Sequence, residues 1–177
     1  GRIVVTTAFL CTTFHAAAED WPHWRGPQRT GVSQETDWMF QWPEDGPKIA
    51  WKANVGLGYS GIVVAGGRAV TAGHNDGKDT VFCFDSETGK EVWKHSYPSE
   101  LGAKYFQGGT TGTPTIDGDK VYWLSRWGDL FCFEAADGSG SVLRRGVPVR
   151  RIGDRVVTTV FDLMLAQHGV ARPDLPG

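Results

Sequence analysis

Apolar and polar residues alternate in short runs along the middle of the chain, and residues 80–97 show the pattern most clearly. The run VFCF at residues 81–84 is apolar at every position, which is typical of a strand covered on both faces. Turn-forming residues follow, and extended alternation resumes around Trp93. Asp85 suits such a turn because it accepts bonds from nearby amides, and Gly89 because it takes the left-handed conformation that closes a four- or five-residue connection. The pattern therefore predicts a hairpin, with Trp93 pointing off one face.

A second copy of this hairpin lies further along the chain. Moving forward by about fifty residues places residues 130–138, LFCFEAADG, over residues 81–89, so that two phenylalanines, a cysteine and the closing glycine coincide. Upstream, residues 67–70 fall on residues 118–121, with a slip of two residues in between. An isolated hairpin is marginal in water, and units of about forty to fifty residues made of short strands are typical of propeller blades. The repeat therefore predicts two adjacent blades.

The turn of the first copy resembles a known repeat. Its spacing, DxxTGKxxW at residues 85–93, is similar to the tryptophan-docking motif of pyrroloquinoline-quinone-type β-propellers, a superfamily that includes quinone-dependent alcohol dehydrogenases and outer-membrane assembly lipoproteins. The segment DWPHWRGP at residues 20–27 resembles the start of secreted propeller proteins from environmental bacteria. The resemblance covers about residues 19–138 and implies an all-β fold, here a fragment of about two blades from a quinoprotein-like ring of about six to eight. It implies a structural role in the repeat for Asp85, Thr88, Gly89, Trp93, Phe131, Phe133 and Gly138.

Residues 1–18 have the pattern of a signal peptide. Arg2 precedes an apolar run, and Ala16 and Ala18 occupy the two positions that a signal peptidase inspects. We expect cleavage before Glu19 and a periplasmic or extracellular protein with no membrane span after signal removal. A buried strand or helix is the alternative interpretation.

Residues 19–46 are rich in Trp, Pro and Gly and have no sustained period, which predicts an irregular strap lying on the first blade. Arg25 is expected to stack on one of its tryptophans, and an aromatic platform for a ligand is the alternative. Residues 47–142 then hold the incomplete repeats. A partial third copy opens them, because Trp51 matches the tryptophan of the first copy, and it predicts a strand at residues 49–53. The expected anchors of the strap are Trp21, Trp24, Trp38 and Trp42.

Charge and composition narrow the classes of partner. The chain of 177 residues has a formal net charge of −2 and a pI near 6.2, so it lacks the basic excess that nucleic acids or anionic membranes attract. Its 8 Trp and 24 Gly suit a blade protein with tight turns and aromatic wedges between blades. We therefore expect no nucleic-acid partner.

Three places on the chain hold candidate chemistry, each with a structural alternative. Residues 74–79 contain two Asp and one Asn, which suit Ca²⁺, but the closing Glu of an EF-hand is missing and a polar turn explains them as well. His74 has no second histidine at a metal-ligand spacing. Residues 104–107, and the pair Arg126 and Trp127, are expected on loops that cross a propeller face, where a ligand near the axis would meet them.

Cys83 and Cys132 occupy equivalent positions in the two copies. Equivalent strands of adjacent blades stand about 10 Å apart, whereas a disulfide needs Cα atoms within about 7 Å. We expect both to be small apolar core residues. The adjacent pair of cysteines that quinone-dependent alcohol dehydrogenases place against their cofactor is absent from the chain.

Residues 143–177 depart from the repeat. The register predicts an aromatic residue near Val142, and none is present. From Gly146 onward the chain resembles a segment of the catalytic subunit of respiratory nitrate reductases, without that family's molybdenum or iron-sulfur ligands. A short helix outside the repeat is expected at residues 161–168. A foreign tail joined from a second gene and a linker into another domain both remain open.

Two functional hypotheses follow. The chain shows no nucleophile elbow, phosphate loop or metal-ligand cluster, so we expect no catalytic residues, no metal and no cofactor. This favours a binding or scaffold module in the cell envelope, whose partner is a protein or a small-molecule ligand on a propeller face. The alternative that the resemblance implies is a dehydrogenase of alcohols or sugars, dependent on pyrroloquinoline quinone with calcium. We expect the chain to bind no quinone.

Overall fold

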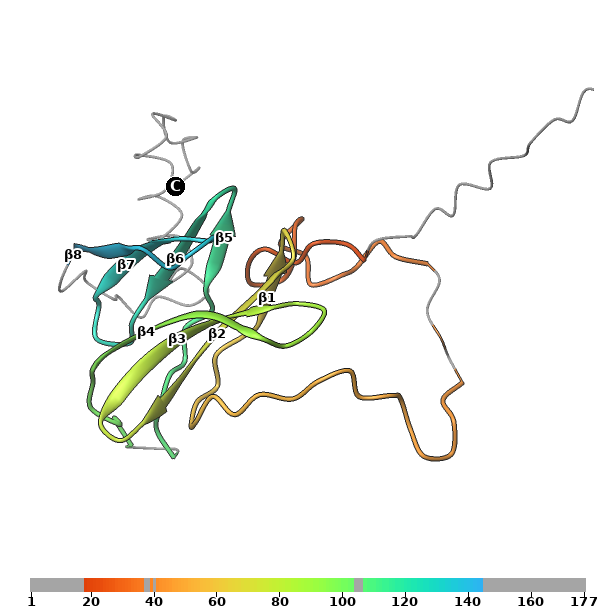
Figure 1. Cartoon of the computed structure of the whole chain (residues 1–177), viewed down its shortest axis with the longest axis horizontal. Coiled ribbons are helices and arrows are strands. Elements are labelled where there is room, and N and C mark those ends of the chain that lie inside the picture. The colour runs from red at the N-terminus through yellow and green to blue at the C-terminus, as the bar shows by residue number, and fades with distance from the viewer. Residues whose placement is uncertain (1–17, 37–38, 40, 104–106, 145–177) are drawn as a thin grey trace, which may run out of the picture.

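The chain forms two antiparallel sheets of four strands each (Figure 1). The computed structural model describes residues 18–36, 39, 41–103 and 107–144. The described residues contain no helix, and the predicted all-β fold is confirmed. The first sheet, which we call blade 1, has the strand order β1 (Val63–Ala65), β2 (Arg68–Asn75), β3 (Lys78–Asp85) and β4 (Glu91–Pro98). The second, blade 2, has the order β5 (Thr115–Asp117), β6 (Lys120–Leu124), β7 (Leu130–Glu134) and β8 (Gly140–Arg144).

Two-residue turns join the first three strands of blade 1. Gly66 and Gly67 connect β1 to β2 with φ angles of 56° and 73°, and Asp76 and Gly77 connect β2 to β3 with φ angles of 50° and 72°. Two successive residues with positive φ match the twist of the strands they join, and Asp-Gly and Gly-Gly are the preferred pairs. The polar turn considered for residues 74–79 is therefore confined to Asp76 and Gly77, because His74 and Asn75 end β2 while Lys78 and Asp79 begin β3.

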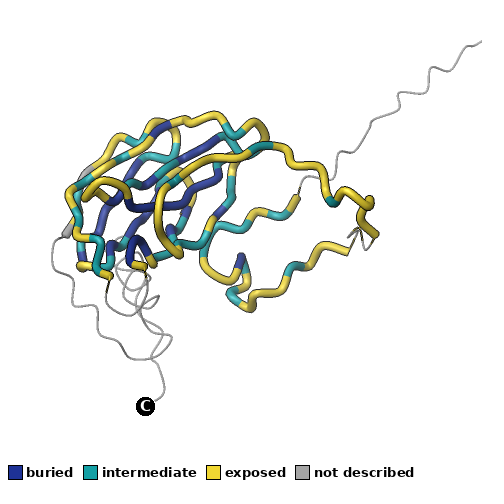
Figure 2. The backbone as a smooth tube through the Cα atoms, turned by 90° about the horizontal axis from the view of Figure 1, so that it is seen from below, coloured by how far each residue is buried: buried dark blue, intermediate teal, exposed yellow. Residues whose placement is uncertain are grey.

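The core lies between the two sheets, whose buried residues form one cluster; Figure 2 shows the buried stretches of the backbone, dark blue, gathered in the interior. Successive side chains of a strand point to opposite faces, so each blade presents one face to the other. The face of blade 1 is made mainly of small residues and that of blade 2 of large ones, which is how the two surfaces interlock. The buried residues are Val63, Val70, Ala72, Val81, Cys83 and Trp93 of blade 1 and Ile116, Val121, Trp123, Phe131 and Phe133 of blade 2.

Strand pairing fixes the register of the repeat. Arg68 pairs with Asp85, and Lys120 pairs with Glu134, so Arg68 and Lys120 are equivalent. The register expected upstream of the hairpin, which places Ala69 over Lys120, is wrong by one residue. A shift of one residue turns a side chain to the other face of a sheet. The expected match would have put Val70 and Val121 on the same face of their blades, whereas the observed pairing puts them on opposite faces.

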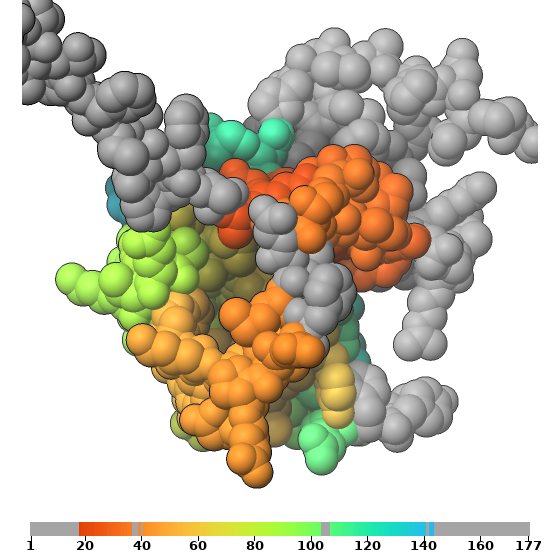
Figure 3. Space-filling view, turned by 90° about the vertical axis from the view of Figure 1, so that its right-hand side faces the viewer, coloured from red at the N-terminus to blue at the C-terminus, as the bar shows by residue number. Residues whose placement is uncertain are grey.

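The strap joins the inner strands of the two blades. The backbone of Trp21 pairs with that of Val64 in β1 at 2.6 and 2.9 Å, and the carbonyl of Pro22 accepts a bond of 2.7 Å from the amide of Ile116 in β5. The strands β1 and β5 contact one another. Figure 3 shows the strap, red to orange, in front of this side of the molecule.

Only part of the expected anchoring of the strap is observed. Trp21 is half-buried and its ring covers Gly26, but Trp24 and Trp42 are exposed, so those two are wrong as anchors. The guanidinium of Arg25 lies 5.4 Å from the centre of the Trp24 ring, as expected for a stacked pair.

Two expected boundaries also differ from the structure. Residues 49–53 form no strand, because no described strand lies beside them. The last strand of blade 2 continues to Arg144, two residues beyond the expected end of the repeats at residue 142. The predicted helix at residues 161–168, the export segment up to residue 17, Trp38 and residues 104–106 lie outside the described residues.

Candidate functional site

A tryptophan from blade 1 docks on a turn of blade 2 and fixes the spacing of the blades. Trp93 lies over Gly138, where an added Cβ would come within 2.6 Å of the ring, and its Nε1 donates a bond of 3.0 Å to the carbonyl of Ala135. Its ring centre is 5.5 Å from that of Phe133, and the residue is 7% exposed. Position 138 requires glycine for two reasons, since its φ is 72° and the indole occupies the place of a side chain.

Trp51 repeats this arrangement on blade 1. Its Nε1 donates a bond of 3.0 Å to the carbonyl of Ser86, its ring covers Gly89, and its centre lies 5.9 Å from that of Phe84. The interplanar angles of the two aromatic pairs are 41° and 44°. Trp51 therefore takes the place on blade 1 that Trp93 takes on blade 2, although its own segment forms no strand.

Hydrogen bonds hold the docking turn of blade 1. The carboxylate of Asp85 accepts bonds of 2.8 and 2.7 Å from the amide and the hydroxyl of Thr88. These bonds favour the ionised carboxylate, and they lower the pKa of Asp85. The turn of blade 2 uses Asp137 instead, which accepts a bond of 2.8 Å from the amide of Ser139. Six of the seven residues assigned to the repeat lie in or against the two docking turns, whereas Phe131 packs on His95 and Tyr97 of blade 1.

The opposite end of the blades carries the candidate site. Four segments meet there, and we call their surface the end face: residues 55–59, the turn Asp76–Gly77, the connection at residues 99–103 and 107–110, and the turn at residues 125–129. Main-chain bonds link the first three segments, from Leu57 to His74 in both directions at 2.9 and 2.7 Å and from Tyr59 to Thr110 at 2.7 Å. The side chain of Arg126 links the fourth to the carbonyls of Leu101 and Gly109. The end face is therefore a connected surface that draws on both blades.

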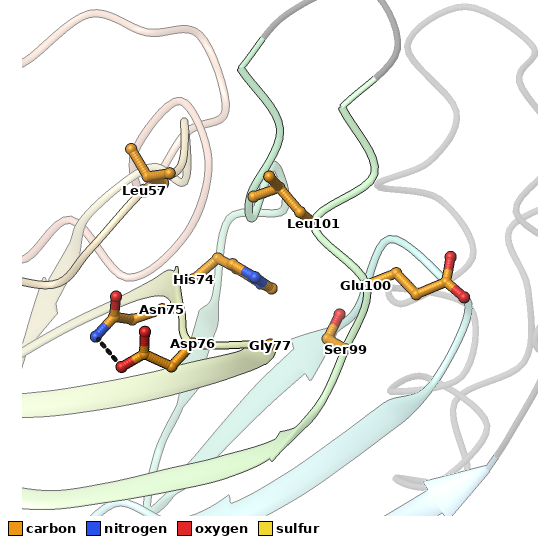
Figure 4. Close-up of a pocket in the computed structure, with 8 residues that line it drawn as sticks. All are labelled: Leu57, His74, Asn75, Asp76, Gly77, Ser99, Glu100 and Leu101. Carbon is orange, nitrogen blue, oxygen red and sulfur yellow. Dashed lines mark hydrogen bonds between the residues drawn. The ribbon is translucent and has the colours of Figure 1, made fainter.

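The end face contains an open cavity of about 620 Å³ (Figure 4). The turn of blade 1 forms one side, the start of the connection to blade 2 forms another, and Leu57 and Leu101 form an apolar wall. Such a volume is within the range of ligand pockets. The lining residues are Leu57, His74, Asn75, Asp76, Gly77, Ser99, Glu100 and Leu101.

A buried pair of titratable residues supports the floor of the cavity. The Nδ1 of His74 lies 2.7 Å from a carboxylate oxygen of Asp79, and the two side chains are 6% and 1% exposed. The other oxygen of Asp79 accepts bonds from the hydroxyl of Ser99 at 2.8 Å and of Tyr97 at 3.5 Å. Both carboxylate oxygens of the buried Asp79 are thus satisfied by side-chain hydrogen bonds.

This network continues into the interface between the blades. The hydroxyl of Tyr97 accepts a bond of 2.7 Å from Nε1 of Trp123. Burial is the main reason that the pKa of Tyr97 is raised, while the bond from Trp123 lowers it in part. The cavity floor is therefore tied to a core residue of blade 2.

Arg126 positions the connection rather than facing the site. Its guanidinium donates bonds of 3.1 Å to the carbonyls of Leu101 and Gly109 and lies 5.3 Å from the centre of the Trp127 ring. Trp127 is 49% exposed. Of the two loop residues that sequence reasoning singled out as ligand contacts, Trp127 thus presents a free surface, while Arg126 holds the backbone.

Sequence reasoning missed the pair of His74 and Asp79. Both lie in the segment considered for calcium, but Asp79 is buried and bonded to other side chains, and the described residues contain no group of three or more potential metal ligands. The signal that reveals the pair is the Asp76–Gly77 turn, because a two-residue turn places the fifth residue after His74 directly across the ladder.

Comparison with known proteins identifies the family. The model of the family described as outer membrane protein assembly factor BamB matches residues 43–141, which is more than half of the chain and includes nearly all of both blades. The chain belongs to this family of quinoprotein-like repeat propellers. The two sheets are therefore β-propeller blades, in agreement with their tryptophan docks.

A second, shorter similarity leads to a different protein. The chain is 62% identical over 45 residues to the nitrate reductase alpha subunit of Mycobacterium tuberculosis strain CDC 1551 / Oshkosh, and equally to that of strain ATCC 25618 / H37Rv. The match covers 25% of this chain and 4% of each subunit. The chain thus spans a small fraction of these relatives, and their activity does not transfer to it.

Solved structures with a similar arrangement are propellers of two kinds. The europium-containing methanol dehydrogenase aligns with a TM-score of 0.35 at 24% identity, over 45% of this chain and 14% of that one. BamB from Moraxella catarrhalis aligns with 0.36 at 24%, over 51% and 24%. The quinohemoprotein alcohol dehydrogenase ADHIIG from Pseudomonas putida HK5 aligns with 0.32 at 22%, over 45% and 12%. Scores this low carry no argument about function.

The quinone that the superfamily resemblance implies does not fit the end-face cavity. The lining residues include Asp76 and Glu100 but no lysine or arginine, so the cavity would repel the carboxylates of pyrroloquinoline quinone.

Within the part of the chain that the structure describes, no helix has the length and hydropathy needed to cross a membrane.

Proposed function

We propose that this chain belongs to an exported β-propeller that acts as a binding module in the cell envelope, with the end face as its binding surface. The observation that carries the proposal is the exposure of large apolar side chains on the end face. Leu57, Tyr59 and Trp127 are 48%, 60% and 49% exposed. The segments of Leu57 and Tyr59 are joined to the blades and the connection by main-chain bonds, and the segment of Trp127 is joined to the connection by the side chain of Arg126. Gathered apolar side chains on a surface are typical of protein interaction sites.

Family membership supports this assignment. The family takes its description from an outer membrane assembly factor, and residues 1–18 have the pattern of an export signal. In the proposal these residues direct export and are removed, residues 19–46 tie the inner strands of the blades together, residues 47–142 form the blades, and residues 143–177 take no part in binding. Aromatic side chains such as Trp127 are enriched in protein interfaces.

Site-specific photo-cross-linking tests the proposal. A photoreactive phenylalanine analogue is placed at Trp127 on the end face and, as a matched control, at exposed Glu87 in the docking turn at the other end. We expect a discrete cross-linked species in the envelope fraction from position 127 and none from position 87. Equal cross-linking from both positions, or an uncleaved chain that stays in the cytoplasm, would refute the proposal. Mass spectrometry of the exported product is expected to give a chain that begins at Glu19.

A further inference from the structure

We infer that the strap contains a binding site for the amino terminus that export creates, in which the carboxylate of Glu35 pairs with the new α-ammonium group of Glu19. The inference rests on the proposed function, because it takes cleavage before Glu19 as its starting point. It combines two independent observations: the small residues Ala16 and Ala18 in the sequence, and the hydrogen bonds around the nitrogen of Glu19 in the structure. The ligand of this site is a primary ammonium group that the chain itself carries.

A carboxylate already lies at the nitrogen that cleavage converts into the amino terminus. The main-chain nitrogen of Glu19 donates a bond of 2.6 Å to Oε1 of Glu35, which follows it by 16 residues. In the uncleaved chain this nitrogen is an uncharged amide with one hydrogen. Cleavage turns it into an amino group whose ordinary pKa is about 7.7 to 8.0, so that at neutral pH it is mostly an ammonium ion. The contact then becomes an ion pair, which is stronger than a bond with one charged partner.

The contact belongs to a reciprocal set of bonds between the two ends of a loop. Oε2 of Glu19 accepts bonds of 3.4 Å from the hydroxyl of Ser33 and from the amide of Gln34. The hydroxyl of Ser33 in turn accepts a bond of 3.1 Å from the amide of Glu35. The site thus gathers two carboxylates, those of Glu19 and Glu35, and a positive charge on the nitrogen of Glu19 reduces their mutual repulsion.

The site lies where the strap joins blade 1. Directly after the new terminus, Oδ2 of Asp20 accepts a bond of 3.4 Å from the amide of Gly66, and the main chain of Trp21 pairs with that of Val64. Figure 1 shows this part of the strap, in red, beside β1. An ion pair that joins the ends of a loop restricts the chain between them. Cleavage therefore holds residues 19–35 more firmly against blade 1 after export than before it.

Hydrogen exchange of three chains tests the inference. One is the full chain, one begins at Glu19, and one begins at Ala18, so that its ammonium group is displaced by one residue. The readout is the exchange rate of the Trp21 amide, with the His74 amide of blade 1 as an internal reference. Glu35 is exposed and solvent screens the pair, so we expect the chain that begins at Glu19 to protect the Trp21 amide about two- to fivefold more than the other two. The His74 amide is expected to exchange alike in all three.

Charge removal provides the second measurement. Glu35→Gln keeps an acceptor oxygen and removes only the charge, so we expect it to abolish the extra protection in the chain that begins at Glu19 and to change the full chain less. Glu44→Gln is the matched control, because Glu44 is another exposed carboxylate of the strap, and it is expected to leave exchange unchanged. Equal protection of Trp21 in the three chains, or the same effect of Glu35→Gln with and without cleavage, would overturn the inference.

The two proposals fail separately, because the exchange experiment uses chains of defined length and does not depend on export. If cross-linking from position 127 is specific but the three chains exchange alike, the end face is a binding surface and the terminus site is wrong. If the chain that begins at Glu19 is protected while position 127 gives no specific cross-link, the terminus site is right and the role of the end face is wrong. An exported chain that begins at a residue other than Glu19 would overturn the inference alone.

Discussion

The two blades are alike at one end and different at the other. At the docking end, both carry a glycine under a tryptophan, and the indole nitrogens donate to carbonyls at the same distance of 3.0 Å. At the end face, β2 and β3 have eight residues each, whereas β6 and β7 have five. The extra length of the central hairpin of blade 1 carries His74 and the Asp76–Gly77 turn to the cavity. The docking end is therefore scaffold, and differences in hairpin length create the site.

The sizes of the facing side chains also differ between the blades. Blade 1 contributes Val70 and Ala72 to the core, whereas blade 2 contributes Trp123 and Phe131. The small side chains of blade 1 leave room for these rings, while His95 and Tyr97 of β4 pack directly on Phe131. The two blades are consequently not interchangeable, and their order in the chain determines how they pack.

Removal of the docked indole between the blades is expected to have the largest effect on stability. Trp93→Ala should lower the free energy of unfolding by about 3 to 5 kcal/mol, the usual cost of truncating a buried aromatic residue. Trp51→Ala should cost less, because Trp51 is only half-buried. Urea unfolding of both variants of the full chain measures the difference. Equal losses would mean that the two docks contribute alike and that burial does not distinguish them.

Trp93→Phe separates the contributions to this dock. The smaller ring keeps contact with Gly138 and Phe133 but loses the bond to the carbonyl of Ala135, which is worth about 1 kcal/mol. We expect a stability between those of the wild-type chain and Trp93→Ala. A phenylalanine variant as unstable as the alanine variant would show that the indole N–H, rather than packing, dominates.

Glycine substitution tests the same dock from the other side. Gly138→Ala and Gly118→Ala both force alanine into a positive φ, at 72° and 57°, which costs about 1 to 2 kcal/mol each. An added Cβ meets the Trp93 ring at position 138 and nothing within 4 Å at position 118. We therefore expect Gly138→Ala to be the more destabilising in the same unfolding assay. If the two variants are equally stable, the indole is free to move aside.

Sequence patterns predicted the parts of this structure that depend on local chemistry. The hairpin around Asp85 and Gly89 follows from turn propensities, and the second blade follows from the repeated FCF run. The predicted register of the repeat upstream of the hairpin is wrong by one residue. Valines at neighbouring positions look equivalent in a sequence, whichever face of the sheet they occupy. Strand pairing, which determines the face, depends on contacts that a single sequence does not display.

The candidate site was less accessible to sequence reasoning than the fold. The cavity depends on segments far apart in the chain, since Leu57 and Leu101 flank a turn that carries His74. The segment at residues 49–53 has the residues of a strand but no neighbour with which to pair. Both outcomes are set by tertiary neighbours, and local composition does not specify those.

The blade interface is expected to respond to pH through His95. This residue of β4 packs against two rings of blade 2, with centroid distances of 5.6 Å to Phe131 and 4.9 Å to Phe133. Desolvation by burial lowers the pKa of His95 below its ordinary value of 6.5. The unfolded chain therefore takes up the proton first as the pH falls below 6.5, and the folded state loses stability relative to it. Above this pH the stability is fully retained.

His95→Phe should reduce this dependence without removing it. Burial also lowers the pKa of His23 in the strap, so a residual slope in the same direction is expected. The measurement is the urea midpoint of the wild-type chain and the variant at about pH 7.5 and about pH 5.5, on either side of the ordinary histidine pKa. A variant with the full wild-type slope would place the pH dependence elsewhere.

Thiol reactivity gives the smallest and most local test of the comparison. Cys83 and Cys132 occupy the same position of the repeat, yet Cys83 is fully buried against blade 2 and Cys132 is only half-buried, because equivalent faces of successive blades cannot both point into one interface. Burial raises the pKa of Cys83 to about 11, so at about pH 8 only about one Cys83 thiol in a thousand is ionised and reactive. Burial also raises the pKa of Cys132, and a bond with the hydroxyl of Tyr122 partly offsets this rise.

In a Cys11→Ser background, where the cysteine outside the described residues is removed, an aromatic disulfide reagent is expected to label Cys132 within the native state and Cys83 only after addition of denaturant. Adding Cys132→Ser should abolish the native-state reaction. Labelling of Cys83 in the folded chain at the rate of Cys132 would mean that the blades separate readily in solution, and it would refute the packing of the small face of blade 1 against the aromatic face of blade 2.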